Sequence, residues 1–360
     1  MTSTALPVCD SPEELTSDWL TAALATAGVR TPVVAVTHQR VGNGQIGTSY
    51  RLGLTYADPE AATAEGAPAS LVAKMAAGDP GARQIISGGY RNEVGFYRDL
   101  VDTLAVRTPR CWHASITDDS TCFVLLLEDV SPAQPGDQVR GCTVEETRAA
   151  VVNLAGLHGP RWNDPDLVDG TWLTRHDEAG AEFFAQVFAG AVPQFVEHFA
   201  GRLSDADPAT LDDVAEHLQA WLLARPERTS LIHGDYRPDN LMFGPDGTVT
   251  ALDWQTLGLG LPGRDVGYLL GTSLDPELRR SAEHDLVAAY HDALRTHGVD
   301  DHDVHVAFED YRLGVVQGPL TTVLGAVYAQ APNDASDAMF TAMITRSLAA
   351  IRDLRPFELL

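Results

Sequence analysis

Short apolar runs separated by turn residues fill the first 130 positions of the chain. Runs of this length, bounded by Gly, Pro, Asn and Asp, are typical of β-strands. We expect strands at Val33–Val41, Ser49–Tyr56, Ser70–Met75, Pro109–Ile116 and Thr121–Leu127. A helix should precede them at Thr16–Ala27, another should be inserted at Tyr90–Leu104, and residues 57–69 should form a loop. The pattern predicts a small sheet of five strands with one inserted helix.

The periodicity becomes helical after a linker-like stretch at Ser131–Gly136. Thr143 and Glu146 have the spacing of a capping box, so a helix should begin there and run to His158. Further helical periodicity lies near 180–200, 208–224, 275–297, 304–328 and the C-terminus. Because 360 residues exceed the size of one ordinary core, we expect two domains, covering residues 1–129 and 130–360.

A short β-like island interrupts the helices of the second half. It comprises Ser230–His233, Leu241–Phe243 and Thr248–Asp253. Pro245-Asp246-Gly247 between the last two segments is a hairpin turn signal. The hairpin should therefore bring positions on either side of it close together.

The acidic balance of the chain limits its partners. The net charge is −25 at pH 7, and such a field repels nucleic acid and anionic membrane surfaces, so we expect neither as a partner. No apolar run approaches the about 18 residues that span a membrane, and the first residues lack the pattern of a signal peptide. We expect a cytoplasmic protein, and its oligomeric state is left open.

Lysine usage singles out one position. Lys and Arg together number 25, and Lys74 is the only lysine among them. It lies in the apolar segment Ser70–Met75, where surface solubility does not require a charge. A compact ammonium group that reaches into a site would explain its place there.

The densest group of chemically capable residues is His233–Asn240, followed by the hairpin and by Asp253. Phosphoryl transfer needs a carboxylate that orients or deprotonates the attacking hydroxyl, and oxygen ligands for Mg²⁺. Asp235 can supply the first function. Asn240 and Asp253 can supply the second, because the hairpin connects them.

The same segment resembles the catalytic loop of the protein-kinase superfamily, H-x-D-x-x-x-x-N. The resemblance implies Asp235 as the catalytic base, Asn240 as a Mg²⁺ ligand, and Asp253 as the metal-binding Asp of the D-F-G position, with ATP as donor. Arg237 then either stabilises the transferred phosphate or forms a structural salt bridge. His233 is expected to hold the loop by hydrogen bonds rather than to titrate.

The order of elements in the first half is that of a kinase small lobe. A glycine-rich turn carries Gly42, Gly44 and Gly47, whose backbone amides can approach phosphates without Cβ clashes. Lys74 should hold the α- and β-phosphates, and Glu93 on the following helix should hold Lys74.

Two further segments are assigned by the same resemblance. Leu127 and Glu128 fall at the hinge, where an apolar strand that leaves the sheet can offer backbone groups to adenine. Asp265 resembles a buried Asp that anchors the catalytic loop, which is a structural function.

The segment after Asp253 separates small-molecule kinases from protein kinases. Trp254-Gln255 replaces Phe-Gly, a helix begins near Gly263, and no A-P-E motif follows, so an extended peptide has no docking segment. The chain is similar to aminoglycoside and choline kinase-type phosphotransferases. Several stretches resemble most closely the ecdysteroid-kinase-like bacterial group and the kinase domain attached to some acyl-CoA dehydrogenases: Gly42–Tyr50, Leu154–Trp162, Leu252–Gln255, Gly271–Asp275 and Glu309–Gly314. This implies an α+β, protein-kinase-like fold of two lobes, with a small antiparallel sheet in the N-lobe and a mainly helical C-lobe.

Two classes of function stay open. The first is an enzyme that phosphorylates a hydroxyl group of a small molecule, either an aminoglycoside-type antibiotic or a steroid-like or hydroxyacyl metabolite. The second is a pseudokinase, a nucleotide-binding module that regulates a partner. Phe308, Tyr311 and Tyr328 either line an apolar acceptor pocket or serve ordinary helix packing.

Overall fold

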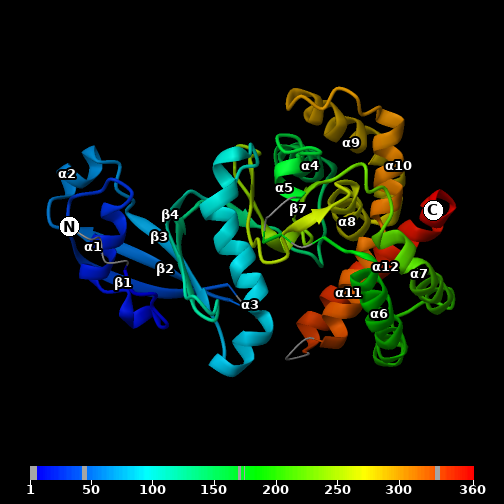
Figure 1. Cartoon of the computed structure of the whole chain (residues 1–360), viewed down its shortest axis with the longest axis horizontal. Helices are drawn as coiled ribbons and strands as arrows, with labels where there is room; N and C mark the ends of the chain where they lie inside the picture. Colours follow the sequence, from blue (N-terminus) through cyan, green and yellow to red (C-terminus); the bar gives the residue numbers. More distant parts are fainter. Residues whose placement is uncertain (1–5, 43–46, 169–171, 174, 329–332) are drawn as a thin grey trace. The chain divides into compact units, whose positions relative to one another are not determined.

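A computed structural model describes residues 6–42, 47–168, 172–173, 175–328 and 333–360. Contacts divide the described chain into two compact units (Figure 1). Unit 1 comprises the described residues within Met1–Asp102, Thr108–Ser131 and Asp253–Gln255. Unit 2 comprises those within Thr103–Arg107, Pro132–Leu252 and Thr256–Leu360. The short segment 253–255 therefore packs with unit 1, although the residues around it pack with unit 2.

Unit 1 is built on an antiparallel sheet of five strands in the order β1-β2-β3-β5-β4, as expected from the pattern. The strands are β1 (Val33–Val41), β2 (Gly47–Tyr56), β3 (Ser70–Ala76), β4 (Cys111–Ile116) and β5 (Phe123–Glu128). Along β3, Leu71, Ala73 and Met75 are buried in a core shared with helix α1 (Ser17–Ala25). Because side chains alternate along a strand, Lys74 projects from the opposite face.

Two helices of unit 1 differ from the sequence expectation. Residues 57–69 were expected to form a loop but contain α2 (Pro59–Ala64), which Asp58 caps. The Asp-Pro pair was interpreted as a turn, although Pro at the first position of a helix is favourable. The helix expected at Tyr90 begins ten residues earlier as α3 (Pro80–Gly95), because Gly88 and Gly89 weaken its helical signal. A π-helical turn (Phe96–Leu100) and a 3-10 turn (Val101–Thr103) continue it.

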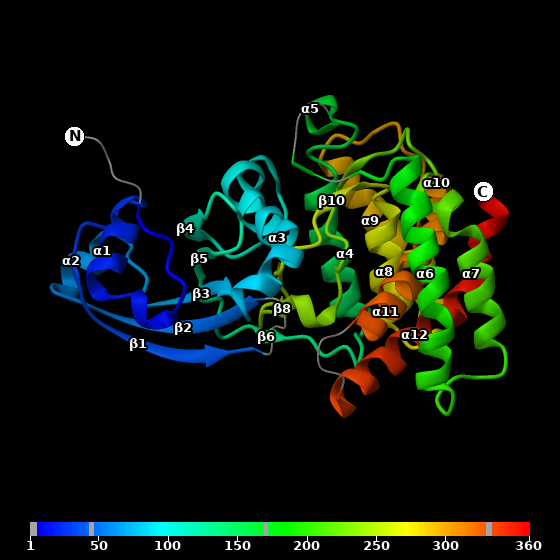
Figure 2. The ribbon, with the colours of Figure 1, turned by 60° about the horizontal axis from the view of Figure 1, so that its bottom comes forward.

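Unit 2 is mainly helical (Figure 2). Its helices are α4 (Val144–His158), α5 (Pro165–Val168), α6 (Glu178–Phe199), α7 (Asp207–Leu222), α8 (Gly263–Ser273), α9 (Pro276–Thr296), α10 (Val304–Gly314), α11 (Gln317–Tyr328) and α12 (Asp334–Leu354). Every residue of α8 is buried, and this helix contacts α4, α9, α10, α11 and α12, so it forms the centre of the unit. The capping box of Thr143 and Glu146 is confirmed at the start of α4. Among the described residues no helix has the length and apolarity needed to cross a membrane.

The helical periodicity expected over 304–328 is confirmed, and the structure divides it into two helices. α10 ends at Gly314 and α11 begins at Gln317. Pro319 explains the break, because proline is tolerated in the first turn of a helix but clashes with the carbonyl four residues earlier in its interior.

Short strands frame the segment between residues 233 and 240. β7 (Ser230–Ile232) pairs with β10 (Gly258–Gly260), and β8 (Leu241–Phe243) pairs with β9 (Val249–Ala251). β6 (Gln134–Pro135) adds to the edge of β8. The expected hairpin is confirmed, with Gly247 at a φ of +82° in its turn.

Candidate active site

The loop that follows β7 is anchored through its backbone. The carboxylate of Asp265, on the buried helix α8, accepts the amide of His233 at 2.6 Å and that of Gly234 at 2.9 Å. Gly234 has a φ of +79°, and a Cβ there would lie 2.7 Å from the carbonyl oxygen of Thr256. Only glycine fits this turn without strain, so Gly234 and the carboxylate of Asp265 together fix the backbone of the loop.

Asp235 has both carboxylate oxygens held by neighbouring donors. Oδ1 accepts the hydroxyl of Tyr268 at 2.7 Å and Nε of Arg237 at 3.1 Å. Oδ2 accepts Nδ2 of Asn240 at 2.8 Å. The side chain is still 23% exposed, so an oriented carboxylate remains accessible to a substrate proton.

Asn240 lies in a 3-10 turn (Pro238–Asn240) and is oriented by Asp235. Its Nδ2 donates to both the carbonyl oxygen and Oδ2 of Asp235, at 2.9 and 2.8 Å. The amide nitrogen is committed in this way, so Oδ1 is the group that Asn240 can offer to a ligand. A hard cation such as Mg²⁺ prefers an oxygen donor of this kind.

Arg237 forms ion pairs within the same loop, with Asp235 and with Asp239. Burial opposes its charge, but the carboxylates of Asp235 and Asp239 raise the pKa of Arg237 above its ordinary value. Asp239 in turn accepts the amide of Gln138 at 2.9 Å, which ties the loop to the segment before α4. Arg237 thus has a structural function in this loop, and its predicted contact with phosphate stays a prediction.

The ring of His233 serves the backbone of the loop. Nε2 lies 2.9 Å from the carbonyl oxygen of Leu252, and Nδ1 accepts the amide of Asp235 at 3.3 Å. These contacts use both ring nitrogens, since Nε2–H donates and Nδ1 accepts. The arrangement agrees with a structural function for this histidine.

In unit 1, Lys74 lies between two carboxylates. Its Nζ is 2.7 Å from Oε1 of Glu93 and 3.3 Å from Oδ1 of Asp253. Glu93 is 1% exposed, whereas Asp253 is 40% exposed. Burial disfavours the ammonium form, but Asp253 and Glu93 outweigh it and raise the pKa of Lys74, so the side chain is charged at neutral pH.

The segment 253–255 packs tightly beside this lysine. Asp253 has a φ of +62°, which is unfavourable for a residue with a Cβ and is tolerated best by Asn and Asp. The ring of Trp254 stacks on Phe96 with centroids 3.6 Å apart. Gln255 donates to Oε2 of Glu93 at 3.1 Å, and its carbonyl accepts Nδ2 of Asn92 at 3.1 Å. A non-glycine residue in a strained conformation is commonly found at functional sites.

The glycines of the expected phosphate-binding turn are only partly described. Gly42 has a φ of +71° in open space. A Cβ on Gly47 would lie 3.2 Å from Cε of Lys74 and 3.4 Å from Nε2 of Gln255, so glycine keeps room beside the lysine. Gly44 lies outside the described residues.

The expected hinge residues are engaged in the sheet. Leu127 pairs with Val72 on one side and with Cys111 on the other. The amide of Glu128 donates to the carbonyl of Arg110 at 2.8 Å, and its carboxylate accepts the amide of Arg110 at 3.1 Å. A contact of Leu127 or Glu128 with adenine stays a prediction.

Comparison with known sequences decides the family. Residues 87–300, more than half of the chain, match the phosphotransferase enzyme family. The chain belongs to this family. One curated relative of the chain is mouse acyl-CoA dehydrogenase family member 10, with 37% identity over 82 residues, 21% of this chain and 8% of that protein. The chain therefore spans only a small part of that relative's length.

Solved structures of other phosphotransferases share the fold. Choline kinase from Cryptosporidium parvum Iowa II has a TM-score of 0.55 at 9% identity, over 90% of this chain and 91% of that chain. Spectinomycin phosphotransferase in complex with ADP and spectinomycin has a TM-score of 0.54 at 12% identity, over 94% and 99%. The GDP complex of aminoglycoside 2′-phosphotransferase-IIIa has a TM-score of 0.51 at 13% identity, over 92% and 98%. The predicted α+β, kinase-like fold of two lobes and the predicted family are confirmed.

The structure groups the predicted residues into two sets. Asp235, Arg237 and Asn240 form one cluster in unit 2, and Lys74, Glu93 and Asp253 form another in unit 1. Sequence reasoning missed Tyr268 and Gln255, which contact these clusters directly. Gln255 follows Asp253 at a fixed offset and had a signal in the sequence, whereas Tyr268 lies in a uniformly buried helix that resembles ordinary core.

Proposed function

We propose that this phosphotransferase uses ATP and Mg²⁺ to phosphorylate a hydroxyl group of a small molecule, with Asp235 as the base. Family membership supports the transfer of a phosphoryl group. The nucleotides named with similar structures, ADP in the spectinomycin enzyme and GDP in the aminoglycoside enzyme, support a nucleoside triphosphate as donor.

The orientation of Asp235 carries the proposal. Tyr268, Arg237 and Asn240 donate to its two oxygens, and the amides that Asp265 accepts hold the turn before it. A carboxylate fixed in this way loses little freedom when a hydroxyl binds. It can accept the hydroxyl proton as the oxygen bonds to the γ-phosphorus and the bond from that phosphorus to the bridging oxygen breaks, which releases ADP. The catalytic-loop Asp has this function in kinases.

Lys74 is proposed to bind the phosphates of the nucleotide. Glu93 and Asp253 stabilise its charge. Its ammonium group has three N–H donors, one more than these two carboxylates use. Gly47 leaves space beside its Cε. The proposal requires this set and the Asp235 set to act on one nucleotide. Leu252, whose amide donates to the carbonyl of Asn240 at 2.9 Å, immediately precedes Asp253 in the chain.

The donor set fits Mg²⁺. Asn240 offers Oδ1, because its nitrogen is bound to Asp235, and Asp253 offers a carboxylate that is 40% exposed. The ion, when bound, would neutralise charge on the phosphates. The chain's own contribution is to hold these oxygens on two short segments, the 3-10 turn Pro238–Asn240 and the strained backbone at Asp253.

The acceptor is proposed to be a small molecule, as the names of the choline and spectinomycin enzymes suggest. The aromatic residues of 304–328 give less support for an apolar pocket than for helix packing. Phe308 stacks on His284 with centroids 4.1 Å apart, and Tyr311 is fully buried and donates to Glu283. Antibiotic and steroid-like or hydroxyacyl acceptors therefore both belong in a screen that measures ADP release.

The decisive experiment combines this screen with Asp235→Asn. Loss of the base should lower turnover about 10²–10⁴-fold, while Mg²⁺-dependent ATP binding, measured by calorimetry, should be retained. Asp212→Asn, on the exposed face of α7, is the matched control and should behave as the wild type. A wild-type protein that binds no nucleotide would contradict the proposal.

The screen also tests the pseudokinase alternative. That alternative predicts nucleotide binding without ADP release for any hydroxyl compound, and no difference between the wild type and Asp235→Asn. The occupied network around Asp235 favours the enzyme, because a regulatory module does not require an oriented base.

A further inference from the structure

A cationic pocket lies in unit 2 beside the start of β7, and none of its lining residues has been assigned to phosphoryl transfer. Its volume is about 70 Å³, and it is bounded by the end of α7, by β10 and by the start of α8. The basic or imidazole side chains that line it are Arg175, His176, Arg225 and Arg264. No Asp or Glu is among its lining residues in the part of the chain that the structure describes. In a chain with a net charge of −25, this concentration of positive charge needs an explanation.

Arg264 lines the pocket and is 4% exposed. Its guanidinium lies over the ring of Trp221 at 4.3 Å and donates to the carbonyls of Trp221 and Leu222, at 3.3 and 2.9 Å. Among the described residues no carboxylate lies within ion-pair distance of it, and its buried Nε has no hydrogen-bond partner. Burial lowers the pKa of Arg264 to about 10, although the negative charge of the neighbouring Asp265 acts in the opposite direction.

Two other buried or half-buried arginines of unit 2 are compensated by a carboxylate, whereas Arg346 donates only to backbone carbonyls of Gln138, Val139 and Thr272. Arg228 binds Asp310 through two nitrogens, and Arg279 pairs with Glu283. A buried charge without a partner is costly, so proteins normally supply a counter-ion from within. Arg264 has no carboxylate within ion-pair distance in the described chain and, unlike Arg346, is almost fully buried, so an anion from outside would stabilise its charge.

Arg175 and Arg225 extend the positive surface. Arg175 is exposed and donates to the carbonyl of Pro226 at 3.4 Å, and Arg225 donates to the carbonyl of Leu359 at 2.8 Å. Neither forms an ion pair within the described residues. Burial and the charge of Arg264 lower the pKa of His176, so its imidazole is a neutral hydrogen-bond donor at pH 7.

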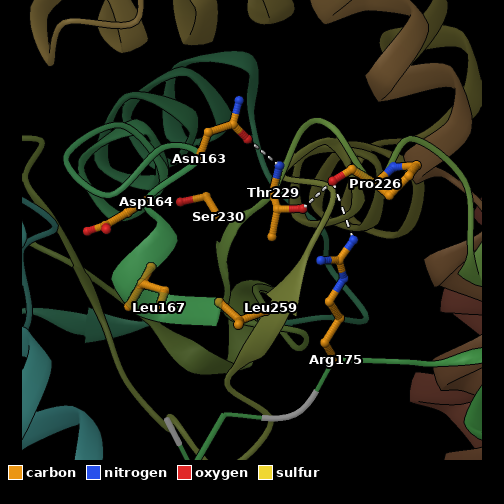
Figure 3. Close-up of a pocket in the computed structure, with 8 residues that line it drawn as sticks. All are labelled: Asn163, Asp164, Leu167, Arg175, Pro226, Thr229, Ser230 and Leu259. Carbon is orange, nitrogen blue, oxygen red and sulfur yellow. Dashed lines mark hydrogen bonds between the residues drawn. The ribbon is translucent and has the colours of Figure 1, made fainter. Parts of the chain in front are cut away.

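A second pocket of about 130 Å³ adjoins the first and shares Arg175, Pro226, Thr229 and Leu259 with it (Figure 3). Figure 3 shows the side chain of Arg175 directed to the Pro226 carbonyl, beside the paired Asn163 and Thr229. The one acidic residue of this second pocket, Asp164, is already paired with Arg161. The second pocket leaves room for the uncharged part of a ligand whose charged group lies at Arg264.

We propose that this pocket binds a compact anionic group, a phosphate or carboxylate carried by a small molecule, against Arg264, Arg175 and Arg225. Guanidinium groups bind both anions with paired hydrogen bonds. The orphaned Nε of Arg264 and the absence of a lining carboxylate in the described residues carry this assignment. The pocket is independent of the proposed reaction, because none of its lining residues belongs to the Asp235 or Lys74 sets.

The test measures the unfolding midpoint of the intact chain during titration with inorganic phosphate or acetate at constant ionic strength. Either anion should stabilise the wild type in a saturable way. Arg175→Gln and Arg225→Gln should each weaken the apparent affinity about tenfold, as expected for loss of one charge-assisted hydrogen bond. Arg264 itself is left intact, because its removal could unfold the chain.

Two controls make the result decisive. Arg295→Gln, at the exposed end of α9, should respond as the wild type. Lys74→Ala should keep the phosphate response, because phosphate at the nucleotide site would instead depend on that lysine. Equal responses of the wild type, Arg175→Gln and Arg225→Gln would overturn the proposal, as would a response that disappears only in Lys74→Ala or no response to either anion.

Discussion

The two sets of proposed site residues are held by different forces. In unit 1, Lys74, Glu93 and Asp253 are held mainly by charge, with one ammonium between two carboxylates. In unit 2, the loop at Asp235 is held mainly by directed hydrogen bonds, which start from the backbone amides bound to Asp265. Both arrangements are ordered, but only in the second does a partly exposed carboxylate, that of Asp235, accept hydrogen bonds from three side chains.

This difference suggests a division of function. Ion pairs are less directional than hydrogen bonds, and an ammonium can exchange one oxygen partner for another at little cost. We therefore propose that Lys74 moves from Asp253 to a phosphate of the nucleotide, while Glu93 retains it. As the proposed base, Asp235 would have to meet a hydroxyl in one geometry, and a preorganised loop suits that function.

Lys74→Ala should disturb the unit 1 set most strongly. We expect kcat/KM for ATP to fall about 10²–10³-fold, as is typical when one preorganised donor to a developing charge is removed. The variant also leaves Glu93, 1% exposed, without its cation, which should cost about 3–5 kcal/mol of stability. Steady-state kinetics and urea unfolding measure the two effects separately.

A paired variant separates chemistry from folding. Lys74→Met combined with Glu93→Gln removes both charges and should restore the urea midpoint toward that of the wild type. Its activity should remain as low as that of Lys74→Ala. Recovery of activity together with stability would show that Lys74 is only structural.

Asp265→Asn tests the hydrogen-bonded loop of unit 2. The amide side chain offers one acceptor oxygen where the carboxylate accepts two backbone amides, at 2.6 and 2.9 Å. We expect the free energy of unfolding to fall by about 2–3 kcal/mol, because a buried donor loses its partner. The value of kcat should fall about tenfold while KM for ATP changes little, and urea unfolding with steady-state kinetics provides both readouts. An unchanged unfolding midpoint would show that the loop does not depend on this anchor.

The sequence was informative about the fold wherever periodicity was strong. The five strands of unit 1 and the helix after Thr143 appeared where alternation and capping residues indicated them. The differences lie where one or two residues act against the pattern, as Gly88 and Gly89 do inside α3 and Pro319 does at the start of α11. Their effects depend on exact position in a turn, which periodicity does not report.

The residues of the candidate site could also be predicted from the sequence only in part. Asp235, Asn240 and Asp253 lie within one short stretch of sequence, and their spacing was enough to propose them. Tyr268 lies 33 positions from Asp235 and meets it only because α8 is buried beneath the loop. Contacts of this kind depend on tertiary packing, so a buried tyrosine could not be distinguished from ordinary core.

Tyr268→Phe should change kcat least, and it tests most directly whether hydrogen bonds orient Asp235. The ring and its packing remain, and only the hydroxyl that donates to Asp235 at 2.7 Å is lost. One hydrogen bond to a charged group among several should change kcat about threefold to tenfold. KM for ATP should be unchanged, because Tyr268 contacts the proposed base and none of the residues of the Lys74 set.

Tyr56→Phe is the matched control for that variant, because its hydroxyl donates one hydrogen bond, at 2.9 Å, to the carbonyl of Pro68 in unit 1. Both variants lose a single tyrosine hydroxyl, so urea unfolding should report similar losses of stability, about 1 kcal/mol each. Only Tyr268→Phe should lower kcat, which single-turnover kinetics can assign to the chemical step. If both variants keep full kcat, the hydrogen bonds around Asp235 stabilise the fold without orienting the base, and the proposed difference between the two sets disappears.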